Sequence, residues 1–252
     1  MGVVVAREMQ EDKDKIYEIL RLDILELKLR PGLIFSIKDI SEMYEVGRSP
    51  VRDALISLSK EGLITFLPQR GTMVSKINCD KVKNERFLRT CVEENVMLEF
   101  MAVCDLKAIT ELEMSLNRQL KSQKDGNIRD FIEEDMYFHS IFYYGAKKGY
   151  IYEILSANSG NYGRLRLLSM AERGIESVVL EEHRALVDAV LVKDSEQMHK
   201  VLDCHLNRLV SQERPLMIRN PELFDQQEVK PKRVSDELGV DFLVETKLKY
   251  HV

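Results

Sequence analysis

Residues 37–74, IKDISEMYEVGRSPVRDALISLSKEGLITFLPQRGTMV, combine helix and strand patterns within one short segment. Ser36 precedes the first helical pattern and Asp39 follows three residues later, which is the spacing of a capping-box variant. Gly47 breaks this helix. Pro50 fits only the first turn of the next helix, because proline has no N–H to donate. The stretch therefore predicts two short consecutive helices.

A hairpin follows the second helix, which is predicted to end at Gly62. The runs LITFL and TMVSKI flank a tight turn at residues 68–71, as two antiparallel strands do. Upstream, residues 12–29 place apolar side chains at helical spacing, and the tripeptide RPG at 30–32 stops that pattern. Three helices and a hairpin in this order form a winged helix-turn-helix, which we assign to residues 1–78.

The pattern changes near residue 82 and continues to 213 as long amphipathic helices with almost no strand signal. The breaks between helices are expected near 124–127, 147–149, 172–174 and 193–195. Roughly six such helices predict an antiparallel bundle, which we assign to residues 79–214. Residues 215–252 form a C-terminal extension with a weaker pattern. The chain as a whole is predicted to be mainly α-helical.

Composition limits the class of protein. The net charge is -5, and no apolar run approaches the roughly 18 residues that a membrane span needs. The cysteines contain no C-x-x-C pair and suit a reducing compartment rather than a disulfide framework. They are Cys79, Cys91, Cys104 and Cys204. We therefore expect a cytoplasmic protein that does not enter the membrane.

The last helix of the motif can present hydrogen-bond donors to DNA from its N-terminal end. Arg48 and Arg52 are four residues apart and project from one face, opposite the apolar positions. A lysine lies near the start of the preceding helix, and the wing tip places an arginine beside a glycine, where the backbone can approach a groove. The candidates for DNA contact are Lys38, Arg48, Ser49, Arg52, Arg70 and Gly71.

The alternative interpretation of these arginines is that they are solvated surface charges, as most arginines are. Residues 1–78 contain twelve Lys/Arg and twelve Asp/Glu, so the segment has no net positive charge. A DNA-binding domain with this balance must concentrate its positive field locally, or bind as a dimer that doubles the contacts.

Residues 37–74 resemble the DNA-binding domain of GntR-family bacterial transcription regulators. The matching features are Arg48, Pro50, Val51, Arg52, Ala54, Leu55, Leu58, Glu61-Gly62-Leu63, Gly71-Thr72 and Val74. The resemblance implies DNA contact for Lys38, Arg48, Arg52, Arg70 and Gly71. The chain departs from the family at Gly47, where Ser or Thr is usual, so a hydroxyl that could cap the helix is missing.

Five histidines raise a second possibility. Asp135 and His139 are four residues apart in EEDMYFHSIF, a run that otherwise indicates a buried helix, so both lie on one face. His183 precedes Asp194 by eleven residues, and His205 follows it by eleven. In an antiparallel hairpin that turns at Asp194, both histidines lie at the same height, roughly 16 Å from the turn. The spacing permits the four side chains to converge.

One carboxylate and three imidazoles suit Zn²⁺, Ni²⁺ or Mn²⁺, and an ion that accepts five or six ligands keeps positions for water or a small carboxylate. The alternative is an ordinary Asp–His pair on a helix surface, with the other histidines hydrogen-bonded inside the bundle.

Residues 82–213 resemble the FCD ligand-binding domain of the FadR subfamily. Its metal-binding members carry D-x-x-x-H on one helix and two histidines on a later helix pair, and all four positions match here. Arg89 and Glu93 match the R-x-x-x-E at the start of that domain, which implies that Arg89 lies beside the effector pocket. Arg164 and Arg166 are weaker candidates for the same role, because surface arginines on a helix explain them equally well.

The resemblance predicts a homodimeric transcription regulator, most often a repressor in this family, that binds palindromic double-stranded operator DNA. A small carboxylate at the metal site would be its effector. One alternative is a metal-dependent hydrolase or lyase, against which there is no H-E-x-x-H, G-x-S-x-G or phosphate-binding loop. Others are a regulator that senses the metal itself, and a metal with a purely structural role.

Overall fold

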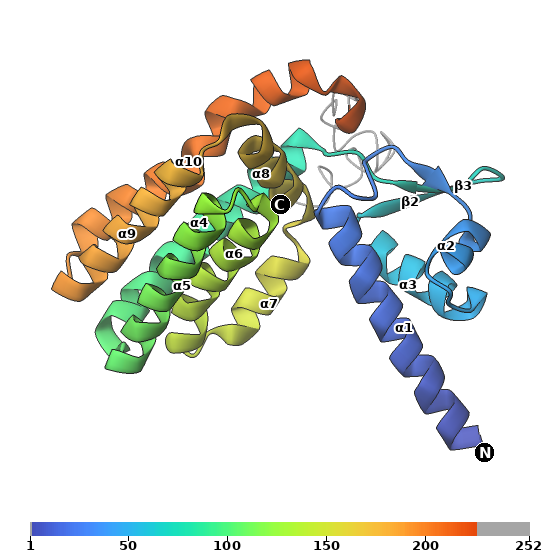
Figure 1. The fold of residues 1–252 in the computed structure, drawn as a ribbon, viewed down its shortest axis with the longest axis horizontal. Coiled ribbons are helices and arrows are strands. Elements are labelled where there is room, and N and C mark those ends of the chain that lie inside the picture. Colours follow the sequence, from blue (N-terminus) through green and yellow to red (C-terminus); the bar gives the residue numbers. More distant parts are fainter. Residues whose placement is uncertain (1, 226–252) are drawn as a thin grey trace, which may run out of the picture.

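The computed structural model describes the backbone of residues 2–225, and the side chains of residues 14–225 apart from 172 and 173. Within that range three helices and a small sheet precede seven packed helices (Figure 1). This architecture confirms the prediction of a mainly α-helical chain with a winged helix-turn-helix before a helical bundle. Much of the predicted C-terminal extension, residues 226–252, lies outside the described residues.

The N-terminal unit contains three helices and three strands. In chain order they are α1 (Gly2–Leu25), β1 (Ile34–Phe35), α2 (Ile37–Met43), α3 (Arg48–Lys60), β2 (Ile64–Leu67) and β3 (Gly71–Val74). The strands form one antiparallel sheet in the order β1-β3-β2, with Ile34 opposite Met73 and Phe66 opposite Thr72. Strand β1 was not predicted, because two residues cannot carry an alternating pattern. Helix α1 begins at Gly2, earlier than the predicted 12–29.

The sequence signals at the start of α2 and α3 correspond to real caps. Ser36 Oγ accepts a hydrogen bond from the Asp39 N–H (3.2 Å), and the Asp39 carboxylate accepts one from the Ser36 N–H (2.8 Å). Gly47 is the N-cap of α3 and supplies no side-chain bond, while Pro50 lies in its first turn. The inner face of α3 packs on α1 to form the core of this unit, whose central residues are Ile16, Leu20, Val51, Ala54, Leu55 and Leu58.

The helical bundle contains seven helices and one short 3₁₀ turn. They are α4 (Cys79–Val103), α5 (Leu106–Lys124), α6 (Ile128–Gly145), α7 (Gly149–Ala157), α8 (Gly160–Arg173), α9 (Glu176–Val192), α10 (Ser195–Arg219) and η1 (Pro221–Leu223). The four predicted breaks fall between helices. Two further breaks, after Val103 and after Ala157, were missed. At the first of these, Asp105 caps α5 by accepting from the Ala108 N–H at 2.8 Å.

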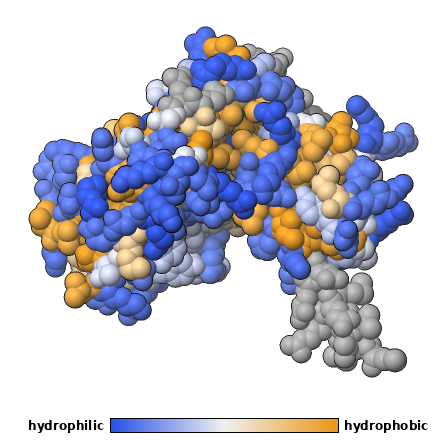
Figure 2. Space-filling model, viewed as in Figure 1, coloured by the Kyte–Doolittle hydropathy of each residue, from blue (hydrophilic) through white to orange (hydrophobic). Residues whose placement is uncertain are grey.

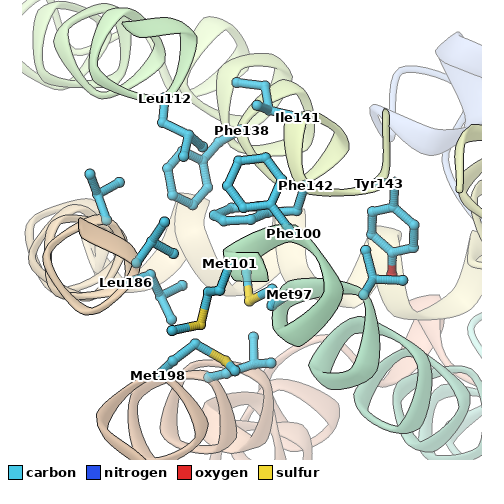
Figure 3. Packing of buried hydrophobic residues seen from close by; sticks show 14 of the residues in the cluster. Met97, Phe100, Met101, Leu112, Phe138, Ile141, Phe142, Tyr143, Leu186 and Met198 are labelled. Atoms are coloured by element: carbon cyan, nitrogen blue, oxygen red, sulfur yellow. The ribbon is translucent and has the colours of Figure 1, made fainter. Parts of the chain in front are cut away.

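Aromatic and methionine side chains fill the centre of the bundle (Figure 3). Phe100 of α4 meets Phe142 of α6 edge to face, with ring centroids 4.9 Å apart, and Phe138 packs against Phe142 in the same way at 5.3 Å. Fully burying such a side chain contributes about 1.5–3 kcal/mol, so this cluster stabilises the packing of α4, α5, α6, α9 and α10. Tyr143 stands apart from the group in Figure 3.

The segment that leaves the wing is tied to the bundle. Ile77 pairs with Phe224 beyond α10, and Asn78 caps α4 by accepting from the Lys81 N–H at 2.9 Å. The Asn78 N–H donates to Asn161 Oδ1 of α8 at 3.1 Å. The connection between the two units is therefore hydrogen-bonded to α8 and to the segment that follows α10. Across residues 2–225, none of the helices combines the length and apolar character that crossing a bilayer requires.

Candidate metal centre and nucleic-acid interface

Three helices bring together the four residues that the spacing singled out. Asp135 and His139 come from α6, His183 from α9 and His205 from α10, and all four are at most 9% exposed. One ligand atom from each lies within 4.8 Å of all the others. The α9–α10 hairpin turns at Asp194, whose carboxylate accepts from the Gln197 N–H at 2.9 Å. This turn sets the two later histidines at the same level, as their spacing predicted.

The ring nitrogens face one another across a small space. His139 Nε2 and His205 Nε2 are 3.2 Å apart, and His183 Nε2 lies 3.7 Å from Asp135 Oδ1. Ring centroids of the three histidines are separated by 4.8–5.1 Å. Two nitrogens that each lie about 2.0–2.1 Å from one tetrahedral Zn²⁺ would be about 3.3 Å apart. The separation of His139 and His205 fits a shared ion.

The Nδ1 atom of each imidazole, on the side away from the other histidines, also has a partner. His139 Nδ1 contacts Glu93, His183 Nδ1 pairs with Gln119 Oε1 at 2.7 Å, and His205 Nδ1 pairs with Glu182 Oε2 at 3.0 Å. An acceptor at Nδ1 fixes the proton there and leaves the Nε2 lone pair pointing inward, which is the arrangement that metal-bound histidines show. The three Nδ1 partners are thus outer supports of the cluster.

Sequence reasoning missed two of these supports. Glu182 directly precedes His183 in the chain, yet it serves His205 on the neighbouring helix. Gln119 lies on α5, fully buried, and no motif marks it. Neither pairing has a signal in the sequence, because each depends on which helices pack side by side.

Burial and mutual repulsion disfavour protonated histidines at the cluster. Burial lowers the pKa of His205 to about 4 and holds the pKa of His183 well below its usual value, where the neighbouring His205 adds to the effect. Burial also lowers the pKa of His139, more than Glu93 raises it. Burial alone would raise the pKa of Asp135, but Arg166 and the three imidazoles outweigh it and lower that pKa. At neutral pH the cluster therefore presents three neutral imidazoles and a carboxylate.

Unpaired polar atoms provide a test of whether a cation fits. Asp135 Oδ1 and His183 Nε2 are buried and find no hydrogen-bond partner among the residues that the structure describes. A buried polar atom without a partner costs about 1–3 kcal/mol, more when charged. Both atoms point into the space between the histidines, where a cation would pair with each. The donor set and the orphaned atoms fit a divalent transition metal.

A cavity of about 440 Å³ opens beside the cluster and reaches His139. Arg89 and Arg166 line it. Arg89 donates to Glu93 at 2.7 Å, with its guanidinium 5.6 Å from the centre of the Tyr162 ring, and Arg166 forms an ion pair with Asp135 at 2.7 Å. The cavity thus brings Arg89 next to the candidate ligands, where the resemblance to the FCD domain implied that it would lie.

Arg164 lies apart from the cavity. We proposed it as an effector-binding residue, but it does not line the cavity, and its side chain is 0% exposed. Arg164 donates to the backbone oxygens of Ser75 (2.6 Å) and Gly160 (2.9 Å), so it braces the connection between the wing and α4. Successive residues of a helix lie about 100° apart, and Arg166, two positions on, is the arginine that faces the cavity.

The predicted DNA-contacting residues gather on the N-terminal unit. Lys38, Arg48, Ser49, Arg52 and Gly71 line one concave surface between α2, α3 and the wing. The side chains of Arg48 and Arg52 are exposed and form no ion pair with any residue that the structure describes. Lys38 lies 3.6 Å from Glu42 in an exposed pair. Unpaired arginines on a concave surface at a helix N-terminus favour phosphate and base contacts.

The wing tip has a backbone that only glycine fits well. Gly71 has φ +105°, and a Cβ atom there would lie 2.7 Å from the Phe35 backbone oxygen of strand β1. Gln69, two residues earlier, adopts φ 58°. The turn therefore holds the exposed Arg70 at the tip of the hairpin, beyond the concave surface.

Comparisons with known proteins agree with this two-part organisation. The model of "Bacterial regulatory proteins, gntR family" matches residues 12–74, and the model of the "FCD domain" matches residues 87–208.

Relatives extend over nearly the whole chain. The HTH-type transcriptional repressor RspR of Escherichia coli (strain K12) is 28% identical over 218 residues, covering 86% of this chain and 96% of that protein. An uncharacterized HTH-type transcriptional regulator in an unstable DNA locus of Streptomyces ambofaciens is 31% identical over 209 residues, covering 83% and 88%.

Two solved structures share the fold. E. coli McbR/YncC superposes with a TM-score of 0.69 at 17% identity, covering 83% of this chain and 98% of that one. A putative GntR transcriptional regulator from Rhodococcus sp. RHA1 superposes with a TM-score of 0.68 at 21% identity, covering 79% and 96%.

Proposed function

The chain belongs to the GntR family of bacterial regulatory proteins and is a DNA-binding transcriptional regulator rather than an enzyme, and from that premise we propose that a metal-bound carboxylate controls its affinity for DNA. In this proposal it acts in the cytoplasm as a homodimeric repressor. Residues 1–78 bind the operator, and residues 79–214 bind the metal and the effector.

The observation that carries the proposal is the convergence of Asp135 Oδ1 with three inward-facing imidazoles, each held at Nδ1 from outside. Asp135, His139, His183 and His205 would hold a Zn²⁺, Ni²⁺ or Mn²⁺ ion. When bound, the ion would supply positive charge and open coordination positions for an anionic oxygen. Among the relatives, the gluconate operon transcriptional repressor of Bacillus licheniformis is named for a carboxylate operon and is 26% identical over 189 residues.

Charge balance favours an anionic effector only when the metal is present. Arg89 and Arg166 carry two positive charges, Glu93 and Asp135 carry two negative charges, and the histidines are neutral. These groups cancel, so a divalent ion leaves a net +2 at the end of the cavity. A carboxylate at that end would be attracted by the ion and would lie beside the Arg89 guanidinium.

A dimer would double the DNA contacts of one N-terminal unit, which has no net positive charge. Lys38, Arg48, Ser49, Arg52, Arg70 and Gly71 form the proposed DNA contact of each protomer. Helix α4 exposes Phe87 (67%), Leu88 (45%) and Leu98 (40%), and apolar side chains exposed along one helix support a contact with a second copy. Two copies related by a twofold axis would match the two halves of a palindromic operator.

Helix α8 is the proposed connection between the effector site and the DNA-binding unit. Arg166 on α8 contacts Asp135, while Asn161 and Arg164 on the same helix bond to the segment that leaves the wing. Glu85 of α4 accepts hydrogen bonds from the N–H groups of Asn161 and Tyr162, at 2.9 and 2.8 Å. A shift of α8 would therefore change the contact with Asp135 and move the segment that leaves the wing. The effector can change the operator affinity only by binding the two arrangements unequally.

Elemental analysis of the purified, untagged protein tests the metal site. We expect about one transition metal per chain in the parent, and none in the His139→Ala and His205→Ala variants. His199→Ala is the matched control, because His199 lies on α10 with His205 but is exposed and pairs with Glu94 at 2.8 Å. No metal in the parent, even after incubation with Zn²⁺, Ni²⁺ and Mn²⁺, would refute the site.

Titration of operator DNA distinguishes the proposal from its alternatives. If the ion alone were the effector, metal exchange would change DNA affinity without any organic acid. If the ion were only structural, a chelator would unfold the helical domain and nothing else would depend on it. Under the proposal, the metal-loaded protein responds to a carboxylate, and the metal-free protein does not.

A further inference from the structure

We infer that the effector is a monocarboxylate with an apolar body, and that helix α1 of the DNA-binding unit forms part of the wall around that body. This inference rests on the proposed function, because the carboxylate is the group that meets the metal end of the cavity. Beyond the proposed function, it specifies the class of carboxylate that fits the cavity and the part of the N-terminal unit that this carboxylate would contact.

Four of the polar residues that line the cavity form one group at its metal end. Arg89, Glu93, His139 and Arg166 all belong to the metal cluster or contact it directly. With an ion bound, the net charge at this end is +2, which favours an anionic head group there. With the ion bound, this end of the cavity would therefore attract the carboxylate of an effector.

The rest of the wall is mainly apolar and comes from four helices. Its side chains include Leu22 and Leu25 of α1, Ile132 and Met136 of α6, Leu155 of α7 and Leu167 of α8. Leu22 and Met136 are 46% and 42% exposed, so part of the apolar wall faces solvent. An alkyl or aromatic body would bury this surface.

The basic residues that line the rest of the cavity are already paired with acidic side chains. Arg21 bonds to Glu61 at 2.8 Å, Lys28 to Asp23 at 2.9 Å, and Arg129 to Glu133 at 3.1 Å. A second carboxylate, or the hydroxyls of a sugar acid, would lose water at the apolar wall without finding comparable new partners. The wall therefore selects against dicarboxylates and polyhydroxy acids.

Helix α1 makes the cavity an interdomain site. Arg21 also donates to the Ser156 backbone oxygen of α7 at 2.8 Å, which holds the C-terminal part of α1 against the bundle. Figure 1 shows α1 meeting the bundle at that end and running away from it toward its N-terminus. On the face in Figure 2, hydrophobic atoms gather where the two units meet, within a largely hydrophilic surface. A ligand in the cavity would touch the DNA-binding unit directly.

Calorimetric titration of the full-length, Zn²⁺-loaded protein tests the ligand class. The probes are acetate, butyrate, hexanoate and octanoate, with succinate, citrate and gluconate for comparison. We expect affinity to rise about fourfold per buried methylene until the cavity of about 440 Å³ is full. Hexanoate should bind more tightly than each of the three comparison acids.

Leu22→Ser tests the wall. Leu22 is exposed, so the variant should fold, and it should flatten the increase in affinity with chain length. Leu33→Ser is the matched control, because Leu33 is 42% exposed on the same unit and does not line the cavity. An unchanged chain-length series in Leu22→Ser would overturn the role of α1.

The outcomes separate this inference from the proposed function. If citrate or gluconate binds more tightly than hexanoate, the apolar-body inference fails and the carboxylate effector stands. If none of the seven acids binds the Zn²⁺-loaded protein, both fail.

Discussion

The candidate metal cluster and the proposed DNA-contacting surface place charged side chains in opposite environments. Asp135 and His183 are 0% exposed, and each depends on partners from other helices. Arg48 and Arg52 are exposed on one short helix, with no ion pair among the residues that the structure describes. The cluster therefore contributes to the packing of the bundle. The proposed DNA-contacting side chains lie on the surface and do not contribute to the packing of the core.

This difference predicts how each region responds to substitution. Removing a charge from the exposed surface leaves no buried atom without a partner, so function should change while stability does not. Removing a partner from the cluster leaves a buried polar group unsatisfied, so metal binding and folding should change together.

The double variant Arg48→Ala/Arg52→Ala should lose the most function at the least cost in stability. Each arginine contact to a base or phosphate contributes about 1–3 kcal/mol, so the affinity for DNA should fall roughly 10²- to 10⁴-fold. Fluorescence anisotropy at fixed salt, on an operator selected in vitro by the parent protein, measures this change.

Lys60→Ala is the control for the arginine variant, because Lys60 is exposed at the opposite end of α3. The melting temperatures of all three proteins should agree. If the double variant bound the operator as tightly as the parent, α3 would not be the recognition helix.

Gln119→Leu should weaken the metal site from a distance. Its amide oxygen pairs with His183 Nδ1 at 2.7 Å, and loss of such an outer partner typically lowers metal affinity 10- to 100-fold. Competition against a zinc chelator reports the affinity. Gln123→Leu is the control, because Gln123 is one turn away on the same helix and bonds instead to Ser177. Equal zinc affinity in both variants would remove Gln119 from the site.

The sequence predicted the residues of the DNA-contacting surface more completely than those of the metal cluster, and the reason is physical. Caps and local patterns lie within a few residues, so the Ser36–Asp39 capping box and the arginines of α3 could be recognised directly. The convergence of His183 and His205 followed from their equal spacing about Asp194. Gln119 and Glu182 could not be found this way, because their roles depend on how neighbouring helices pack.

The position of Arg164 away from the cavity has the same origin. Arg164 and Arg166 are equivalent by composition and neighbours, and a rotation of about 200° along α8 decides which one faces the cavity. That rotation is set by contacts of α8 with α4 and with the segment after the wing, at Glu85 and Ser75. A sequence pattern in one helix does not contain those contacts.

The metal-free protein should lose stability on mild acidification. The pKa of His205 is about 4 in the folded chain and about 6.5 when unfolded, so only the unfolded state takes up this proton as the pH falls through 6.5. Stability from His205 is fully present above 6.5 and declines toward pH 4. Between pH 7.5 and 5 it should fall by about 2 kcal/mol, and the lowered pKa values of His183 and His139 act in the same direction.

Urea unfolding after chelator treatment, at both pH values, measures this loss. His205→Asn should reduce the dependence on pH, while His199→Asn, at an exposed position on the same helix, should leave it unchanged. The buried carboxylates of the cluster do not contribute to the change in stability between pH 7.5 and 5. The pKa values of Asp135 and Glu93 are lowered, so their contributions are lost only at more acidic pH. Equal slopes in the parent and His205→Asn would contradict the burial of a neutral imidazole.

Gly71→Ala should have the smallest effect, confined to the wing. At φ +105°, alanine is strained, and its Cβ would lie 2.7 Å from the Phe35 oxygen. Gly126→Ala separates the steric contact from the backbone strain. Gly126 also has positive φ (+67°), but nothing lies within 4 Å of a Cβ atom added there. We expect Gly71→Ala to cost about 1 kcal/mol more than Gly126→Ala in urea unfolding. It should also weaken operator binding, because Arg70 is carried by this turn. Equal costs would mean that β1 moves aside for the new methyl group. The wing would then be positioned by its hairpin alone, and not by the contact with β1.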